Sequence, residues 1–229
     1  MISVIIPTLN AESSLTDTLA ALVPAAVDGL IREVIVADGG SQDRTAAIAD
    51  AAGAHFVSVS GGRGHQLAGG AARARFPWLL FLHADTALAP GWEREASLFM
   101  ERVDTGAQPP AAAAFRFALD DAGAKPRALE RLVALRCAAL RIPYGDQGLL
   151  IPKRLYDEIG GYRPLPLMED VDLVRRLGRR RLTMLRARAV TSAERFRRDG
   201  YVRRSARNLF CLTLYTLRVP THVISRIYG

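Results

Sequence analysis

The fold is indicated first by the run Ile2-Ser3-Val4-Ile5-Ile6-Pro7-Thr8-Leu9-Asn10, which is apolar and rich in β-branched residues until proline closes it. A short continuous apolar run of this kind predicts a strand that is buried on both faces. Similar runs at 33–37, 55–59 and 78–82 predict three more strands, and helical patterns lie between them. Strands that alternate with helices predict an α/β fold with a mostly parallel central sheet and helices on both of its faces.

Polar residues follow three of these strands at the point where each strand ends. Asn10 comes after the first strand, Asp38 after the second and Asp85 after the fourth. Ligands of open α/β sheets bind beyond the carboxyl ends of the strands. The sequence therefore predicts one binding site where the three polar segments converge.

The remainder of the chain gives weaker patterns, and we expect a single domain over residues 1–229. A strand is predicted at 111–119, a helix at 128–139, a short strand at 149–151 and a helix that begins near Glu169. No internal repeat or low-complexity linker divides the sequence. A chain of this length buries about 70% of its unfolded surface, so it needs no disulfide or structural metal to hold a core.

The formal net charge is +8, and such an excess can indicate a nucleic-acid or anionic-membrane partner. Nearly all of the positive charge is arginine, because lysine occurs only at Lys125 and Lys153. A general bias toward arginine accounts for part of the excess. A local patch adds to it, formed by Arg195, Arg197, Arg198, Arg203, Arg204 and Arg207. No recognisable nucleic-acid motif accompanies the patch, so we expect no nucleic-acid partner.

Cysteine usage and the N-terminal residues predict a cytoplasmic protein. Cys137 and Cys211 have neither the spacing of a zinc site nor that of a disulfide framework. Residues 1–7 contain no basic leader and no apolar stretch of signal-peptide length. A spanning helix needs roughly 18 uninterrupted apolar residues, and no window of the sequence reaches that length.

Six motifs occur in the order in which family 2 glycosyltransferases carry theirs, and the chain resembles that family. The motifs are Ser3-Val4-Ile5-Ile6-Pro7-Thr8-Leu9-Asn10-Ala11-Glu12, Val36-Ala37-Asp38-Gly39-Gly40-Ser41, Gly62-Arg63-Gly64-His65-Gln66-Leu67, Phe81-Leu82-His83-Ala84-Asp85, Tyr144-Gly145-Asp146-Gln147 and Met168-Glu169-Asp170-Val171-Asp172-Leu173. Each motif alone is weak evidence, but the ordered set is specific. It is most similar to short bacterial members that are named for arsenosugar biosynthesis.

The resemblance implies a three-layer nucleotide-binding sandwich of the GT-A type. Its nucleotide-sugar-binding half would be 1–90 and its acceptor half 91–195, with a basic and apolar C-terminal helical segment at 196–229. The residues that it implies for the nucleotide sugar are Pro7, Thr8, Asn10, Glu12, Asp38, Gly39, Arg63 and Asp85. For Asp38 the implied contact is with uracil, although Asp-Gly is also a common turn pair.

Arg63 lies in a glycine-rich loop that opens a helix, and both the guanidinium and the helix N–H groups suit a diphosphate. The loop lacks the third glycine of a dinucleotide-binding motif and the Gly-Lys pair of a P-loop. These two absences argue against dehydrogenase and NTPase functions.

A divalent cation, Mg²⁺ or Mn²⁺, is the cofactor that the resemblance implies. Asp85 follows an apolar strand and offers the carboxylate oxygen that a hard cation prefers. His83 stands where the family more often has an acid, and we list it as a second candidate ligand. Contact with a phosphate and simple packing are the alternatives for His83.

The resemblance implies that Asp170 is the base that deprotonates the acceptor hydroxyl, and Glu169 is the fallback base. Acids at a helix start are also common complements of the helix dipole. Asp146 and Gln147 are candidate acceptor-side residues, although a capped turn would explain them almost as well.

The apolar run at 209–217 follows the arginine patch and is too short to span a bilayer. Arginines beside an apolar helix suit an anionic membrane surface, which would place the protein at the inner face of the membrane. A helix packed on the domain and a homodimer contact explain the same pattern.

We therefore expect an inverting glycosyltransferase that moves a sugar from a nucleotide diphosphate sugar, specifically a UDP-sugar. The acceptor stays open among a lipid phosphate, a small metabolite and a glycan. One alternative is a nucleotidyltransferase of related fold, but residues 8–12 lack the glycine-rich basic loop that it needs. Another is a basic, membrane-associated module without catalysis.

Overall fold

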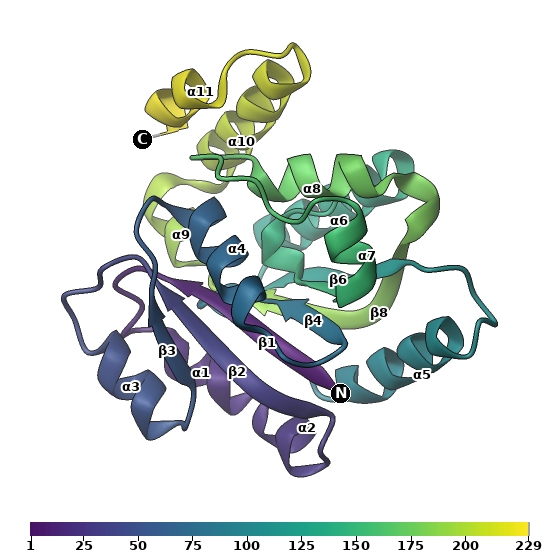
Figure 1. Ribbon diagram of the computed structural model, residues 1–229. Coiled ribbons are helices and arrows are strands. Elements are labelled where there is room, and N and C mark those ends of the chain that lie inside the picture. Colours follow the sequence, from purple (N-terminus) through teal and green to yellow (C-terminus); the bar gives the residue numbers. More distant parts are fainter. Residues whose placement is uncertain (229) are drawn as a thin grey trace.

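One sheet organises residues 1–228, the part of the chain that the computed structural model describes; Gly229, the last residue of the expected domain, lies outside it. The strand order in this eight-stranded sheet is β3-β2-β1-β4-β7-β6-β8-β5 (Figure 1). The strands are β1 (Ile2–Thr8), β2 (Ile31–Asp38), β3 (His55–Ser58), β4 (Trp78–Phe81), β5 (Thr86–Leu88), β6 (Ala112–Leu119), β7 (Leu149–Pro152) and β8 (Leu182–Thr191).

The first four predicted strands form the parallel part of the sheet. β1 pairs in parallel with both β2 and β4, and β2 pairs in parallel with β3. The register sets Thr8 opposite Asp38 at the carboxyl ends of β1 and β2. The N-terminal half of the α/β prediction is thereby confirmed, and its polar strand ends lie at one edge of the sheet.

The second half of the sheet is mixed. β7 runs antiparallel to β4 and β6, β5 runs antiparallel to β8, and β6 with β8 restores a parallel pair. The expected strands at 111–119 and 149–151 are present, whereas β5 and β8 were not expected. Arginines alternate with small residues along β8, so its sequence lacks the apolar run that marked the other strands.

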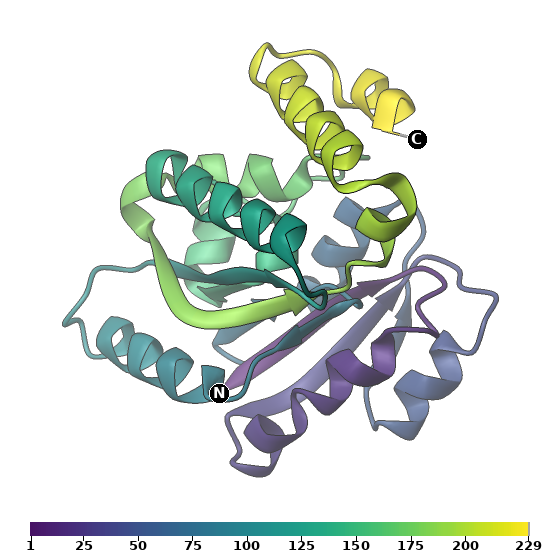
Figure 2. The same ribbon diagram turned by 180° about the vertical axis from the view of Figure 1, so that it is seen from behind.

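Helices cover both faces of the sheet. They are α1 (Leu15–Ala20), α2 (Val23–Val27), α3 (Thr45–Ala51), α4 (Arg63–Arg73), α5 (Trp92–Asp104), α6 (Ala124–Leu140), α7 (Lys153–Glu158), α8 (Glu169–Leu177), α9 (Glu194–Asp199), α10 (Tyr201–Thr216) and α11 (Thr221–Tyr228), with short 3₁₀ turns at Gly145–Gln147 and Arg179–Arg181. One core joins α1, α2 and α5 to one face, and a second joins α4, α7 and α8 to the other. The two views of Figures 1 and 2 show these helices on opposite sides of the sheet.

The C-terminal helices pack on the domain beside the start of α8. Cys211, Leu212 and Ile224 from α10 and α11 form a small core with Met168 and Val171. This is one of the arrangements expected for the apolar C-terminal run, and it brings α10 and α11 to the carboxyl edge of the sheet (Figure 1). Among the described residues, no helix is long and apolar enough to cross a membrane.

Candidate active site

Two neighbouring cavities lie at the carboxyl edge of the sheet. The strand-tip cavity, of about 510 Å³, is bordered by the β1 tip, including Pro7, Thr8 and Asn10, and by Gly39. The carboxylate cavity, of about 130 Å³, is bordered by the turn at 144–146, the start of α8 and the C-terminal helices. Five residues line both cavities: Arg63, His83, Asp85, Ser192 and Arg195. The two cavities therefore share a wall and together make up the candidate site.

Asp38 holds the strand-tip loop together. Its side chain is only 2% exposed and accepts hydrogen bonds from the Thr8 hydroxyl and from the backbone N–H groups of Gly40 and Ser41 at 2.8 Å each. The Ser41 hydroxyl donates a further bond. Burial favours a higher pKa for Asp38, but these hydrogen bonds outweigh it and lower the pKa. In this arrangement Asp38 shapes the loop, and it does not line the strand-tip cavity.

Two other expected residues also tie this loop to its neighbour. The Asn10 side chain accepts a hydrogen bond from the Gln42 N–H at 2.9 Å, and Glu12 accepts one from the Arg44 N–H at 3.0 Å. Asn10 has a positive φ of 51°, which asparagine tolerates better than most residues. Asn10 lines the strand-tip cavity, whereas Glu12 lies outside its lining.

Arg63 stands at the junction of the two cavities. It is the first residue of α4, and its Nε lies 2.9 Å from Glu169 Oε1. Its Nη2 contacts His83 Nε2. About a third of the side chain is exposed, so the guanidinium can meet a ligand while Glu169 holds it. Gly145 makes room for this pair, because a Cβ there would collide with both Arg63 and His83.

The surroundings of His83 disfavour its protonated form. Burial lowers the pKa of His83 well below its ordinary value, and the positive charges of Arg63 and Arg195 lower it further. Its Nε2 faces Arg63, while its Nδ1 lies 3.8 Å from Asp85 Oδ1. Metal ligation by Nε2 would require the Arg63 contact to open, so ligation by His83 stays a prediction.

Two buried carboxylate oxygens at this site have no hydrogen-bond partner within the described part of the chain: Asp85 Oδ1 and Asp146 Oδ1. Burial raises the pKa of Asp146 to about 6, with Asp170 and Asp85 adding to the rise and Arg136 opposing it. An unpaired buried carboxylate oxygen is costly, and a divalent cation is the group that would satisfy it. The residues present thus suit such a cation, although residues 1–228 contain no group of three or more acidic, histidine or cysteine ligands.

The first turn of α8 carries the two expected candidate bases. Met168 precedes them with φ at 65°, a left-handed conformation that is uncommon for a residue with a side chain. Glu169 is 3% exposed, and burial raises its pKa while the Arg63 charge opposes that rise. Asp170 is partly exposed and lines the carboxylate cavity. Its Oδ2 accepts the Gly145 N–H at 2.6 Å and its Oδ1 the Val171 N–H at 2.7 Å, which fixes the carboxylate.

Gln147 points into the protein interior instead of the carboxylate cavity. It is 1% exposed; its Nε2 donates to the Phe115 carbonyl at 2.9 Å, and its Oε1 accepts from the Tyr144 N–H. Gln147 therefore supports the turn that presents Asp146, which agrees with the capped-turn alternative.

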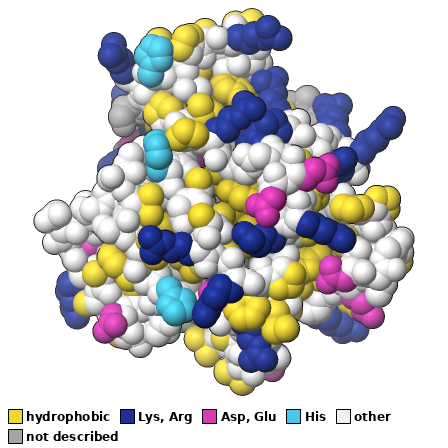
Figure 3. Space-filling view, in the orientation of Figure 1, with side chains coloured by type: hydrophobic (Ala, Val, Ile, Leu, Met, Phe, Trp, Pro, Cys, Tyr) yellow, Lys and Arg dark blue, Asp and Glu magenta, His cyan; other side chains and the backbone are white. Residues whose placement is uncertain are grey.

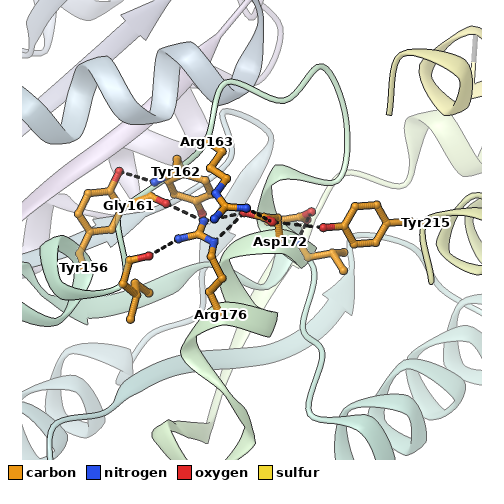
Figure 4. A network of polar contacts seen from close by, with 10 residues as sticks. Tyr156, Gly161, Tyr162, Arg163, Asp172, Arg176 and Tyr215 are labelled. Atoms are coloured by element: carbon orange, nitrogen blue, oxygen red, sulfur yellow. Dashed lines mark hydrogen bonds and ion pairs between the residues drawn. The ribbon is translucent and has the colours of Figure 1, made fainter. Parts of the chain in front are cut away.

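Asp172 anchors the loop that covers the start of α4. Its carboxylate accepts the Arg176 Nε at 2.8 Å and the Tyr215 hydroxyl at 3.3 Å, and it lies 3.5 Å from Arg163 Nη1 (Figure 4). Arg176 also donates to the Gly161 carbonyl at 2.7 Å. These contacts join α8, α10 and the loop at 159–168.

The sequence reasoning missed several residues of the site. Arg195 was assigned to a surface patch, but it lines both cavities. Arg204, which was assigned to the same patch, lines the carboxylate cavity together with Asn208 and Tyr228 from the C-terminal helices. No motif marked these positions, because only the packing of α10 and α11 brings them to the sheet edge.

The α/β fold and the site at the carboxyl edge of its sheet agree with the expected glycosyltransferase. A family model described as glycosyl transferase family 2 matches residues 3–134, which is more than half of the chain. The chain therefore belongs to glycosyl transferase family 2, and the expectation of a glycosyltransferase is confirmed. No curated protein matches the sequence. The narrower resemblance to members named for arsenosugar biosynthesis stays a prediction.

Solved structures share the fold at low sequence identity. TarS of S. aureus (residues 1–349) is 16% identical with a TM-score of 0.66, over 99% of this chain and 69% of its own. The glucosyl-3-phosphoglycerate synthase of M. tuberculosis is 23% identical with a TM-score of 0.63, over 96% of this chain and 81% of its own. A structure of the synthase from Mycobacterium tuberculosis with Mn²⁺, uridine diphosphate and glucosyl-3-phosphoglycerate gives a TM-score of 0.57 at 22% identity, over 83% of this chain and 70% of its own.

Proposed function

We propose that the protein transfers a sugar from a UDP-sugar to an acceptor hydroxyl with inversion at the sugar carbon. The observation that carries this proposal is the pair of unpartnered oxygens on Asp85 and Asp146, in the same cavity as Asp170 and Arg63. A cation site, a fixed carboxylate and a guanidinium are the groups that displacement of a diphosphate requires. The S. aureus and M. tuberculosis neighbours, which are described in complex with UDP, support the choice of nucleotide.

The strand-tip cavity takes the nucleotide in this proposal, and its β1 tip and Gly39 lie against the base and ribose. The diphosphate then extends toward Arg63 and Arg195, which border both cavities. A guanidinium fork binds phosphate oxygens through paired hydrogen bonds. The Glu169 carboxylate pairs with Arg63 Nε at 2.9 Å and holds the guanidinium in the site.

Asp85 and Asp146 would hold the divalent cation through their unpartnered oxygens. When bound, the cation supplies positive charge that offsets the negative charge of the diphosphate. Asp170 takes the proton of the acceptor hydroxyl, and its carboxylate is held ready by the Gly145 and Val171 N–H groups. The acceptor enters through the carboxylate cavity, where α10 and α11 form one wall.

Calorimetric titration with UDP, with GDP as the control nucleotide, tests the proposal in the presence and absence of Mn²⁺. We expect UDP to bind in the micromolar range with Mn²⁺, to weaken without it, and to exceed GDP in affinity. Asp85→Ala should remove most of the effect of Mn²⁺ on the affinity for UDP. The control is Asp43→Ala, at a residue that does not line either cavity, and it should keep this effect. Absence of binding by either nucleotide with Mn²⁺ or Mg²⁺ would reject the proposal.

A further inference from the structure

A second concave surface lies away from the site, between α6 and the strands β6 and β8. Its volume is about 900 Å³, within the range of ligand-binding pockets. We name it the arginine groove, because its lining includes Arg116, Arg127, Arg131, Arg141, Arg186 and Arg188. None of its lining residues lines the strand-tip or carboxylate cavity. Figure 2 shows α6 lying over the long curved strand β8.

The positive charge of the groove is nearly uncompensated. Glu130 is the one carboxylate among the lining residues, and it pairs with Arg127 at 2.5 Å. Arg141 donates to the Leu182 carbonyl at 2.7 Å. Within residues 1–228, no carboxylate forms an ion pair with the other four lining arginines, which are Arg116, Arg131, Arg186 and Arg188. These four exposed guanidinium groups line a concave surface, and such an arrangement favours an anionic ligand.

An irregularity in the strands sets these arginines side by side. Between Ala114 and Arg116 the register shifts, so that Ala114 lies opposite Met184 and Arg116 opposite Arg188. An advance of two residues along β6 thus matches an advance of four along β8, which makes a bulge in β8. Glu95 holds the bulged segment by accepting hydrogen bonds from the N–H groups of Arg186 and Ala187 at 2.8 Å each. Bulges of this kind re-aim side chains. Like charges that lie opposite one another in a sheet repel, and the exposed Arg116 and Arg188 are placed in this way.

We propose that the arginine groove binds a ligand that carries two or more phosphate groups. The guanidinium fork matches phosphate geometry, and arginines from β6, β8 and α6 line one groove of about 900 Å³, which has room for more than one phosphate. The groove is concave, and α6 forms one of its walls. This shape suits a ligand group that inserts into the groove better than a partner with a flat surface. The phosphates belong either to a soluble polyphosphorylated molecule or to a lipid headgroup, and the two sources are separable by experiment.

The test uses tripolyphosphate as the probe at about 150 mM salt, where purely non-specific attraction is screened. The groove variant is Arg116→Gln, Arg186→Gln and Arg188→Gln. The control variant is Arg32→Gln, Arg94→Gln and Arg154→Gln, three exposed arginines outside the groove that give the same change in net charge. We expect tripolyphosphate to bind the groove variant at least about tenfold more weakly than the wild type or the control.

Thermal unfolding checks that the groove variant is folded. Tripolyphosphate should raise the Tm of the wild type and the control more than that of the groove variant, in which only the diphosphate site proposed above can still bind it. The groove variant's own Tm should equal or exceed the wild-type value because repulsion is relieved. Titration with UDP on all three proteins reports the proposed donor site independently. If none of the three proteins binds UDP but tripolyphosphate binding still depends on the groove arginines, the proposed function is rejected and the groove proposal is retained.

Sedimentation with vesicles that contain cardiolipin, whose headgroup carries two phosphates, distinguishes the two phosphate sources. If the wild type and the control sediment with the vesicles and the groove variant does not, the phosphates belong to a lipid headgroup. If the wild type binds tripolyphosphate but does not sediment with the vesicles, the ligand is a soluble molecule. Equal weakening in the groove and control variants would overturn the proposal, because the attraction would then be general. Failure of the wild type to bind either probe at this salt concentration would overturn it as well.

Discussion

At the scale of single residues, the site depends on a fixed carboxylate beside a guanidinium. Asp170 carries two hydrogen bonds from backbone N–H groups, and Glu169 beside it is committed to Arg63. Both acids line the carboxylate cavity, but Asp170 is the more exposed of the two, while the buried Glu169 holds the Arg63 guanidinium in an ion pair. The family resemblance implied Asp170 as the base, with Glu169 as the fallback. The contacts agree with that order, because Glu169 is engaged in an ion pair with Arg63 and Asp170 is not.

Asp170→Asn should lower kcat roughly 10²–10⁴-fold, because the amide cannot accept the acceptor proton. The Kd for UDP should stay within about twofold, since Asp170 does not border the strand-tip cavity. Steady-state transfer assays and UDP titration measure the two effects. Full activity in Asp170→Asn would reject Asp170 as the base.

Gly145→Ala should reduce both UDP affinity and turnover, roughly tenfold to a hundredfold. A Cβ at this position would collide with Arg63 and His83 and would approach Asp170 Oδ2 to 3.3 Å. Small displacements of catalytic groups have effects of this order. Titration and transfer assays measure the loss, and an unchanged Tm would confirm that the variant is folded. Wild-type affinity would show that Arg63 does not contact the diphosphate.

At the scale of elements, β1 and β2 are joined by a buried polar contact far from the site. Glu33 accepts hydrogen bonds from the Ser3 hydroxyl and from the backbone N–H and Nε of Arg75. Its side chain is 1% exposed. Burial favours a higher pKa for Glu33, but these hydrogen bonds outweigh it and hold the pKa below its ordinary value.

Glu33 should therefore make stability depend on pH. Because its folded-state pKa lies below the unfolded value of about 4.3, its contribution is present in full above that pH and is lost as the pH falls through the folded-state pKa. Glu33→Gln should lower the free energy of unfolding by about 1–3 kcal/mol at pH 7 and flatten its decline below pH 4.5. Urea unfolding at several pH values measures the free energy of unfolding, and Glu101→Gln, at an exposed position, is the control. The same dependence of this free energy on pH in both variants would contradict the prediction.

Prediction from sequence succeeded for elements with a local pattern and failed where pairing is distant. The β1 and β4 runs are apolar along their length, so their patterns predicted strands directly. β8 is held by β6, some 70 residues earlier, and by Glu95 in α5, and neither contact is visible in its own sequence. The start of α8 was anticipated at Glu169, and the structure begins that helix there.

At the scale of the whole molecule, the C-terminal helices have an inner and an outer face. The inner face packs against α8 and lines the carboxylate cavity. The outer face of α10 exposes Val202, Leu209 and Phe210 at 82%, 62% and 52%. Arginine and hydrophobic side chains intermix over this end of the protein (Figure 3). A membrane partner for the outer face stays a proposal, and the packed inner face means that truncation would damage the site.

Point substitutions test that proposal without uncovering the inner face. Replacing Val202, Leu209 and Phe210 with serine should reduce pelleting with anionic vesicles at least about fivefold, because apolar burial and charge attraction act together. The control replaces Val23, Val27 and Leu98, three exposed apolar residues on α2 and α5, with serine. Wild-type pelleting by the α10 variant, or equal loss in both, would reject membrane contact through α10.

The sequence by itself determined the parallel core, the family and the order of the motifs, because short apolar runs and the polar residues that follow them are local features. The tertiary structure decided which of those residues line the two cavities at the carboxyl edge of the sheet. It turned Asp38 and Gln147 inward onto hydrogen bonds, and it left oxygens of Asp85 and Asp146 without partners. It also brought α10 to the sheet edge. Burial and partner choice depend on residues far apart in the chain, which no local pattern records.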